Sequence, residues 1–309
     1  MKLKITELLE NSRELSWRNF GREIIFYLPG MFTLNGDRGR YPAISITGDR
    51  CELNCDHCRA RILESMIHAT TPEALVKRCL KLEEQGNIGC LISGGSLRDG
   101  TLPWLRFADA LARIKEETNL KISIHTGLID FDTAQRLKEA GVDQALIDVI
   151  GDDETLKRVY HLDVGIEAIK SSLDALTTVG IPIVPHIVVG LYYGRIKGEL
   201  EALDMISGYN PSVLVVVSLM PLLGTPMRDV VSPPHSQKIA EILATARLKM
   251  PNIPISLGCA RSRGRDGSWI ETMAVDAGVN RMALWSEEAI ERAKRYDLKI
   301  EFRKTCCSI

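Results

Sequence analysis

Residues 43–61, AISITGDRCELNCDHCRAR, set a short β-branched run directly before three closely spaced cysteines. Seven further apolar runs follow, and after each comes a segment with apolar residues three and four positions apart. This alternation is typical of buried parallel strands covered by amphipathic helices. The eight runs are Ala43–Thr47, Gly89–Ser93, Lys121–His125, Gln144–Val149, Ile181–Gly190, Ser212–Leu219, Ile253–Gly258 and Arg281–Trp285. Eight strand–helix units, one per roughly 34 residues, predict an α/β fold, a full or nearly full (βα)8 TIM-type barrel. A doubly wound open sheet is the competing topology, because periodicity alone does not separate the two.

The predicted barrel occupies residues 41–285 as a single domain. Before it, residues 1–40 are expected to form a helix and an irregular lead-in, IIFYLPGMFTLNGDRGRYP. After it, residues 286–309 are expected to form a helix, a short strand over Leu298–Arg303 and a cysteine-bearing tail. In either topology the chemistry gathers at the C-terminal ends of the strands, so the loops that follow the runs should carry the site.

Composition excludes several classes of protein. The chain has 309 residues, of which 45% are hydrophobic and 26% charged, and its formal net charge is −1. This near-neutral charge argues against nucleic acid or an anionic membrane as a partner. No uncharged apolar stretch is long enough to predict a transmembrane helix, and the amphipathic start of the chain fits neither a signal nor a transit peptide. Eight cysteines are too few for a disulfide scaffold of this size, so we expect a reduced, cytoplasmic protein.

Cys51, Cys55 and Cys58 have the spacing C-x3-C-x2-C in the loop after the first run. Three thiolates on one loop can hold a [4Fe–4S] cluster and leave one iron open to a small chelating molecule. The alternative is a zinc site with His57 or a distant cysteine as the fourth ligand. Zinc motifs usually come as two separated ligand pairs, so the spacing favours the iron–sulfur cluster.

This motif after the first barrel strand resembles the signature of the radical S-adenosylmethionine (radical SAM) enzymes. The resemblance implies that the cluster of Cys51, Cys55 and Cys58 binds SAM through its methionyl amine and carboxylate. It also implies that reduction of the cluster cleaves SAM to a 5′-deoxyadenosyl radical, which abstracts a hydrogen atom from an unreactive carbon. We therefore expect SAM and a [4Fe–4S] cluster as cofactors.

Four later segments, LISGGS, ALIDVIG, PHIVVGLYYG and VVVSLMPLLGTPM, add to the resemblance. They are similar to segments that contact the amine, ribose and adenine of SAM in relatives, although Ser96 and Tyr193 replace acids of the family pattern. The SAM-binding residues implied in this way are His57, Gly94, Gly95, Ser96, Asp148, Val188, Gly190, Leu219, Met220 and Pro221, and the implied catalytic residues are His186 and Tyr193. Each also has a structural alternative: a glycine turn, a helix-capping aspartate, a buried histidine or a core side chain.

A second group of cysteines lies late in the chain. Cys259 follows the seventh run at the barrel end that carries the triad, and Cys306 and Cys307 lie in KTCCSI. Three interpretations stay open. The tail folds over the barrel mouth and holds a second, auxiliary [4Fe–4S] cluster with Cys259 and with Ser308 as a candidate oxygen ligand; it carries a redox or persulfide thiol; or it is a disordered end without function.

The overall pattern is similar to the biotin synthase and lipoyl synthase branch of the superfamily, and most similar to components of the two-protein lipoyl synthase of archaea and some bacteria. Biotin synthase itself is disfavoured, because three of its auxiliary-cluster cysteines have no evident counterparts here. The lipoyl synthase resemblance implies a sulfurtransferase that inserts sulfur into an unactivated C–H bond of a protein-bound octanoyl group during lipoyl cofactor biosynthesis.

The same resemblance implies three partners: an octanoylated lipoyl carrier protein or lipoyl domain, a second radical SAM chain, and an electron donor such as ferredoxin or flavodoxin. The basic cluster Arg261, Arg263 and Arg265 could receive an acidic carrier domain. Two other functions stay open. One is a biotin-synthase-like mutase or cofactor-maturation enzyme without sulfur insertion, and the other is a non-catalytic iron–sulfur or zinc binding subunit.

Overall fold

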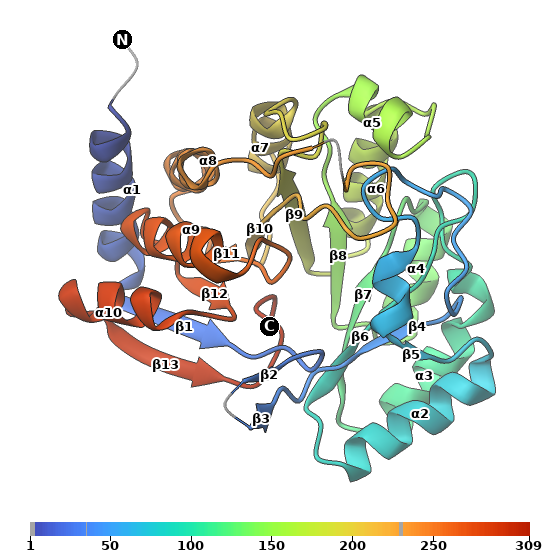
Figure 1. Cartoon of the computed structure of the whole chain (residues 1–309). Helices are drawn as coiled ribbons and strands as arrows, with labels where there is room; N and C mark the ends of the chain where they lie inside the picture. The colour runs from blue at the N-terminus through green and yellow to red at the C-terminus, as the bar shows by residue number, and fades with distance from the viewer. Residues whose placement is uncertain (1–3, 35, 229–230) are drawn as a thin grey trace.

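The computed structural model describes residues 4–34, 36–228 and 231–309 (Figure 1). Each of the eight predicted runs forms a strand: β4 (Ala43–Ser45), β6 (Gly89–Ser93), β7 (Lys121–His125), β8 (Gln144–Asp148), β9 (Ile183–Val189), β10 (Leu214–Ser218), β11 (Ile255–Leu257) and β12 (Arg281–Ala283). These strands are neighbours in chain order, and all their pairings are parallel. The prediction of a TIM-type α/β barrel is therefore confirmed, because a doubly wound sheet would reverse its strand order.

Three more strands extend the curled sheet at its two ends. Beyond β12 come β1 (Glu23–Tyr27) and then β13 (Lys299–Arg303), and β5 (Ile67–His68) pairs with β4. The full order is β13-β1-β12-β11-β10-β9-β8-β7-β6-β4-β5. In the described part of the chain no pairing joins β5 to β13, so the sheet is a curled, incomplete ring. A separate antiparallel pair consists of β2 (Thr33–Leu34) and β3 (Asp37–Arg38).

The strand β1 was not expected, because the lead-in was predicted to be irregular. Its residues Ile24 and Phe26 are fully buried, and it pairs in parallel with both neighbours. The strand predicted over Leu298–Arg303 is confirmed as β13. The division of the chain into residues 1–40, 41–285 and 286–309 stays a prediction, although β1 lies within the same sheet as the barrel strands.

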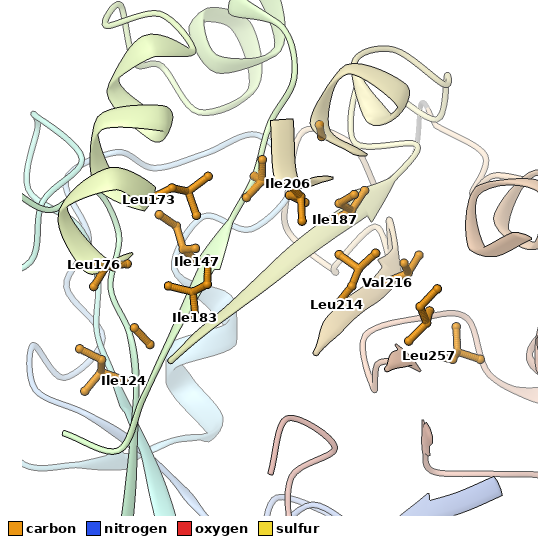
Figure 2. Packing of buried hydrophobic residues seen from close by; sticks show 14 of the residues in the cluster. Ile124, Ile147, Leu173, Leu176, Ile183, Ile187, Ile206, Leu214, Val216 and Leu257 are labelled. Atoms are coloured by element: carbon orange, nitrogen blue, oxygen red, sulfur yellow. The ribbon is translucent and has the colours of Figure 1, made fainter. Parts of the chain in front are cut away.

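Helices cover the outer face of the sheet (Figure 1). They are α1 (Ile5–Phe20), α2 (Pro72–Glu84), α3 (Ala108–Glu117), α4 (Phe131–Glu139), α5 (Asp153–Val159), α6 (Glu167–Thr178), α7 (Glu199–Ser207), α8 (Ser236–Lys249), α9 (Gly264–Asp276) and α10 (Glu287–Arg295), with short 3₁₀ helices η1 (Arg61–Ser65) and η2 (Trp104–Arg106). The outward-facing strand residues Ile147, Ile183 and Leu214 pack with Leu173 and Ile206 of these helices (Figure 2). No described helix is long and apolar enough to cross a membrane.

The opposite face of the sheet lines a lumen. Leu146, Val184 and Val215 belong to a second apolar cluster that also includes Cys307. Because side chains alternate along a strand, these residues point away from the helix-facing core. Figure 1 shows the C-terminal end of the chain inside the curve of the sheet. The end of the chain therefore lies inside the lumen, where Cys307 packs against the strand residues.

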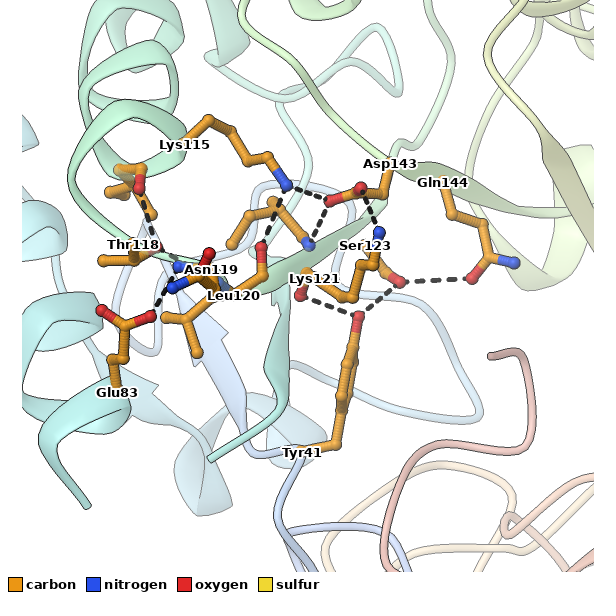
Figure 3. A network of polar contacts seen from close by, with 12 residues as sticks. Tyr41, Glu83, Lys115, Thr118, Asn119, Leu120, Lys121, Ser123, Asp143 and Gln144 are labelled. Atoms are coloured by element: carbon orange, nitrogen blue, oxygen red, sulfur yellow. Dashed lines mark hydrogen bonds and ion pairs between the residues drawn. The ribbon is translucent and has the colours of Figure 1, made fainter. Parts of the chain in front are cut away.

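A polar network braces the N-terminal rim of β7 and β8 (Figure 3). Asp143 accepts hydrogen bonds from the Ile122 amide (2.8 Å) and from Lys115 Nζ (2.7 Å). Nearby, the Tyr41 hydroxyl lies 2.7 Å from Ser123 Oγ. These contacts join α3 to the N-terminal ends of β7 and β8 and so hold that end of the sheet together.

Candidate active site

The loop after β4 holds the predicted triad, and all three cysteines are free thiols. Cys55 is buried in a small cluster with Leu53 and Leu162, against which Cys51 packs. Burial is the largest cause that raises the pKa of the Cys55 thiol, and the neighbouring thiols Cys51 and Cys58 raise it further. Burial also raises the pKa of Cys58, and buried thiols that become easier to ionise beside a positive charge fit a site that binds a cation.

The glycine loop after β6 packs directly on this cysteine loop. A Cβ atom built on Gly95 would lie 2.0 Å from the Arg50 carbonyl oxygen and 2.5 Å from Cys51 Cβ, so only glycine fits. The Gly95 amide donates to Thr47 Oγ1 (2.7 Å), and the Ser96 carbonyl accepts from the Glu52 amide (2.8 Å). The loop that bears Gly94, Gly95 and Ser96 therefore lies against the cysteine loop.

Two polar side chains, Tyr193 and His161, contact the cysteine loop from outside. Asp56 accepts a hydrogen bond from the Tyr193 hydroxyl (2.7 Å) and lies 3.2 Å from His161 Nε2. The other ring nitrogen of His161 lies 2.9 Å from the Leu53 carbonyl oxygen. Tyr193 thus contacts the loop that bears the triad, and in this structure its hydroxyl positions that loop.

His57 and Tyr160 lie side by side next to the triad, with ring centroids 5.3 Å apart. Burial lowers the pKa of His57 to about 4, so the ring is neutral at neutral pH. Its Nδ1 atom is buried and has no hydrogen-bond partner among the described residues. A buried nitrogen without a hydrogen-bond partner destabilises the fold unless a bound ligand supplies that partner.

Asp148, at the end of β8, joins this group to two further histidines. It accepts a hydrogen bond from the Tyr160 hydroxyl (3.3 Å) and lies 3.5 Å from His125 Nε2. Burial alone would raise the pKa of Asp148, but His125 and other neighbouring imidazoles outweigh burial and lower it to about 2. Asp148 caps no helix in this structure, since Asp152 caps α5. It is an ionised acceptor at the C-terminal end of the strands.

His186 faces the same space from β9. Its ring centroid lies 5.6 Å from that of His125, and its Nδ1 lies 3.0 Å from the Val184 carbonyl oxygen. Burial, followed by the neighbouring His125, lowers the pKa of His186 to about 4. A neutral imidazole at this place can accept or donate a hydrogen bond, as the predicted substrate-facing role requires.

The remaining predicted SAM residues lie on the loops after β9 and β10. Val188 faces the lumen, and Gly190 has the positive φ of +78° that a sharp turn needs. Its amide donates to Glu199 Oε1 (2.7 Å), a buried acid that the sequence analysis missed. On the next loop, Leu219 is buried, whereas Met220 is 38% exposed and Pro221 half-buried.

The structure also brings the late cysteines together inside the lumen. Cys307 is 4% exposed and packs with Cys259, and a turn closed by the Ile309 amide and the Cys306 carbonyl (3.2 Å) gathers the two tail thiols. The neighbouring Cys307 thiol lowers the pKa of Cys306 by hydrogen bonding. Burial, and secondly Cys306, raises the pKa of Cys259, so these thiols share one electrostatic environment.

Polar side chains from the strands hold the tail in place. Arg281 donates from Nη1 to the carbonyl oxygens of Cys307 and Ile309, each at 3.0 Å. Gln144 donates to the Ser308 carbonyl oxygen (2.7 Å). The hydroxyls of Ser308 and of Ser256 on β11 are buried, and they lie within hydrogen-bonding reach of the Cys306 and Cys307 thiols respectively.

The basic cluster after β11 differs from expectation. Arg261 is fully buried, where it pairs with Glu271 (2.7 Å) and donates to the Ala283 carbonyl oxygen (2.8 Å). The interpretation of Arg261 as part of a carrier-docking patch is therefore wrong, because an ion pair inside the fold cannot reach a partner. Arg263 donates to the Cys259 carbonyl oxygen (2.6 Å) and so helps to place that cysteine.

The donor sets fit iron–sulfur clusters better than single ions. No three His, Cys, Asp or Glu side chains within the described ranges are gathered as one metal ion requires. A [4Fe–4S] cluster carries each thiolate on a different iron, so its ligands stand apart around the cluster. The three free triad thiols, the close glycine approach at Gly95 and the orphaned His57 nitrogen are consistent with such a cluster and a small ligand on it.

Residues 45–203, more than half of the 309-residue chain, match the Radical SAM superfamily. The protein therefore belongs to the radical SAM superfamily, a membership that implies SAM and a [4Fe–4S] cluster as cofactors. The matched range contains all three cysteines of the triad.

Curated relatives agree with this membership, and solved structures share the fold. Biotin synthase 2 of Paracoccus denitrificans is 27% identical over 178 residues, which cover 55% of this chain and 52% of that protein. Biotin synthase of Zymomonas mobilis is 27% identical over 176 residues, covering 55% and 49%. The match thus spans about half the length of these relatives. Methylornithine synthase (16% identity, TM-score 0.67, covering 98% of this chain and 91% of that one) and the hydrogenase maturase HydG (14%, 0.68, 97% and 69%) share the fold.

Several residues of the site carry no motif in the sequence. His125, Tyr160 and His161 are single aromatic residues near strand or helix ends, and spacing alone gives them no function. Gln144 and Arg281 begin strands, at the barrel end opposite to the predicted chemistry. Only the folded tail shows that these two residues hold Cys307 and Ser308.

Proposed function

We propose that this radical SAM enzyme inserts sulfur into an unactivated C–H bond, and that its substrate is a protein-bound octanoyl group in lipoyl cofactor biosynthesis. The observation that carries the proposal is the burial of Cys307 beside Cys259 in the barrel lumen, with the half-buried Cys306 next to it in the chain. Sulfur insertion needs a sulfur source close to the substrate carbon. Relatives named biotin synthase support this chemistry at low identity.

When bound at Cys51, Cys55 and Cys58, the reduced cluster and SAM supply a carbon radical that can take a hydrogen atom from the substrate. The chain's own residues bind SAM and orient it. Gly95 lets the backbone approach the cysteine loop closely, and the neutral His57 ring offers its unpartnered nitrogen. Asp148 presents an ionised carboxylate suited to two ribose hydroxyls. Leu219, Met220 and Pro221 are the proposed adenine contacts.

In this proposal a second iron–sulfur cluster supplies the sulfur, with Cys259, Cys306 and Cys307 as ligands and Ser308 as a candidate oxygen ligand. His186 then faces the acyl group at the strand ends. The proposed partners are an octanoylated lipoyl carrier protein or lipoyl domain, a second radical SAM chain, and ferredoxin or flavodoxin as electron donor.

The proposal is tested by anaerobic turnover of the reconstituted chain with SAM, a strong reductant and an octanoylated lipoyl domain. We expect 5′-deoxyadenosine, and mass spectrometry should show sulfur gained by the lipoyl domain. Formation of 5′-deoxyadenosine with no sulfur gained, from protein that binds only about four irons, would favour a radical enzyme without sulfur insertion. The Cys306→Ala, Cys307→Ala double variant serves as the matched control, since it keeps the triad.

A further inference from the structure

Glu199, the first residue of α7, is a buried acid that holds both ends of the preceding loop. Its side chain accepts a hydrogen bond from the Gly190 amide on Oε1 (2.7 Å) and another from the Lys197 amide on Oε2 (2.5 Å). These amides lie at the two ends of residues 190–198, which connect β9 to α7 and are called the β9 loop below. One carboxylate, with the residue only 4% exposed, therefore closes this loop.

The charge of Glu199 has no basic partner among the described residues. The ammonium group of the nearby Lys197 pairs instead with Asp152 and Glu154. Burial raises the pKa of Glu199, and the Gly190 and Lys197 amides offset only part of this effect. A buried carboxylate without a cation is costly for a fold. Its two amide contacts indicate that this acid serves the geometry of the β9 loop.

The β9 loop has a backbone conformation that needs such support. Tyr193 has a φ of +50°, which is uncommon for a residue with a Cβ atom. The turn around it is tight, because the Gly194 amide donates to the Gly190 carbonyl oxygen (2.8 Å). A Cβ atom on Gly194 would lie 2.4 Å from the Ser232 carbonyl oxygen. A strained residue keeps its conformation only where the surrounding contacts fix it.

This strained residue is the one that contacts the cysteine loop. The Tyr193 hydroxyl donates to Asp56 Oδ2 (2.7 Å), and Asp56 directly follows Cys55 in the chain. The Asp56 amide also donates to the Val159 carbonyl oxygen (3.0 Å). A continuous series of contacts thus leads from Glu199 through the β9 loop and Tyr193 to the segment that bears the triad.

We propose that Glu199 is a positioning residue for the iron–sulfur cluster of the triad, because it closes the β9 loop in the conformation that lets Tyr193 hold Asp56. Since Glu199 acts through Tyr193, its loss can loosen the cysteine loop no more than the loss of the Tyr193 hydroxyl does. The inference concerns the triad alone, so it stands whether or not the enzyme inserts sulfur.

Hydrogen–deuterium exchange of the full, cluster-free chain tests this role. Glu199→Ala should speed exchange of residues 51–58 by up to about fivefold, the effect that one hydrogen bond permits. In the Tyr193→Phe background the same change should add almost nothing, because residues that act through one contact are not additive. Glu201→Ala is the matched control, since it removes an exposed acid from the same first turn of α7.

Iron release to a chelator from the reconstituted triad should follow the same order, with Glu199→Ala and Tyr193→Phe faster than Glu201→Ala. If Glu199→Ala does not fold, Glu199→Gln replaces it, because a single amide oxygen leaves one of the two backbone amides without its acceptor. Unchanged exchange at residues 51–58, or an undiminished effect in the Tyr193→Phe background, would overturn the proposal. Faster exchange spread evenly over the sheet would overturn it too, since that result indicates a purely structural carboxylate.

Discussion

Arg281 donates a hydrogen bond to the carbonyl oxygen of Cys307 at 3.0 Å. A residue at the start of β12 therefore holds a tail that the last strand delivers into the lumen. Because the same guanidinium also binds the Ile309 carbonyl oxygen, one side chain fixes the turn that gathers the two tail thiols. Placement of the proposed second cluster thus depends on backbone contacts far from the cysteine triad in sequence.

Replacement of Arg281 should release the tail. In Arg281→Gln, the loss of hydrogen bonds from a charged group, each contributing about 1.5–3 kcal/mol, should raise the population of the open tail by roughly tenfold or more. Alkylation of the cluster-free protein, mapped by mass spectrometry, should show Cys306 and Cys307 reacting correspondingly faster. Arg295→Gln on α10 is the control. Equal labelling of the two variants would mean that Arg281 does not anchor the tail.

Tyr193 should stabilise the cysteine loop through Asp56. Tyr193→Phe removes a hydrogen bond of 2.7 Å, which contributes about 1 kcal/mol, so iron should leave the triad several-fold faster in the presence of a chelator. Tyr192→Phe removes an equally local hydroxyl contact, to Glu154, without touching the loop. If both variants lose iron at the same rate, the proposed bracing role is wrong.

Glu271 should be far more important for stability than exposed acids. Its partner Arg261 has no exposed side chain, and breaking one side of a buried ion pair costs about 3–5 kcal/mol. Urea denaturation of Glu271→Ala should show this loss, whereas Glu301→Ala, which breaks an exposed pair with Arg303, should leave the free energy of unfolding nearly unchanged. A small effect at Glu271 would exclude the buried pair as a support of the Cys259 loop.

Asp143 should give the fold part of its resistance to acid. Burial raises the pKa of Asp143, but the Ile122 amide and Lys115 outweigh burial, so the pKa lies below its ordinary value of 3.8. A depressed pKa stabilises the fold above the unfolded value, and this contribution is lost as pH falls through the lower folded value. Asp143→Asn should therefore flatten the decline of unfolding free energy below about pH 4. If the free energy of unfolding of Asp143→Asn falls at acid pH as steeply as that of the unchanged protein, this role is wrong.

The eight barrel strands could be predicted because each is a run of apolar residues followed by a helical pattern. Strands that are buried on both faces have such continuous apolar runs. The strand β1 could not, because Ile24–Tyr27 lies in a segment whose prolines and glycines resemble a loop. Its place between β12 and β13 depends on pairing with strands that lie more than 250 residues away.

The triad and the glycine loop could be predicted because their chemistry demands fixed spacing within short segments. The contacts of His125 with Asp148 and of Arg281 with Cys307 could not, because each joins residues from different elements of the fold. The same limit explains the error at Arg261. A run of arginines in a turn resembles a solvated patch until Glu271 is brought beside it.

The most direct test of the central claim is the iron and sulfide content of the Cys51→Ala, Cys55→Ala, Cys58→Ala variant after anaerobic reconstitution. If Cys259, Cys306 and Cys307 hold a second cluster, the variant should retain about four irons and four sulfides per chain. Further replacement of Cys306 and Cys307 by alanine should remove them. Complete loss of iron from the triple variant, with the fold intact by circular dichroism, would contradict the account.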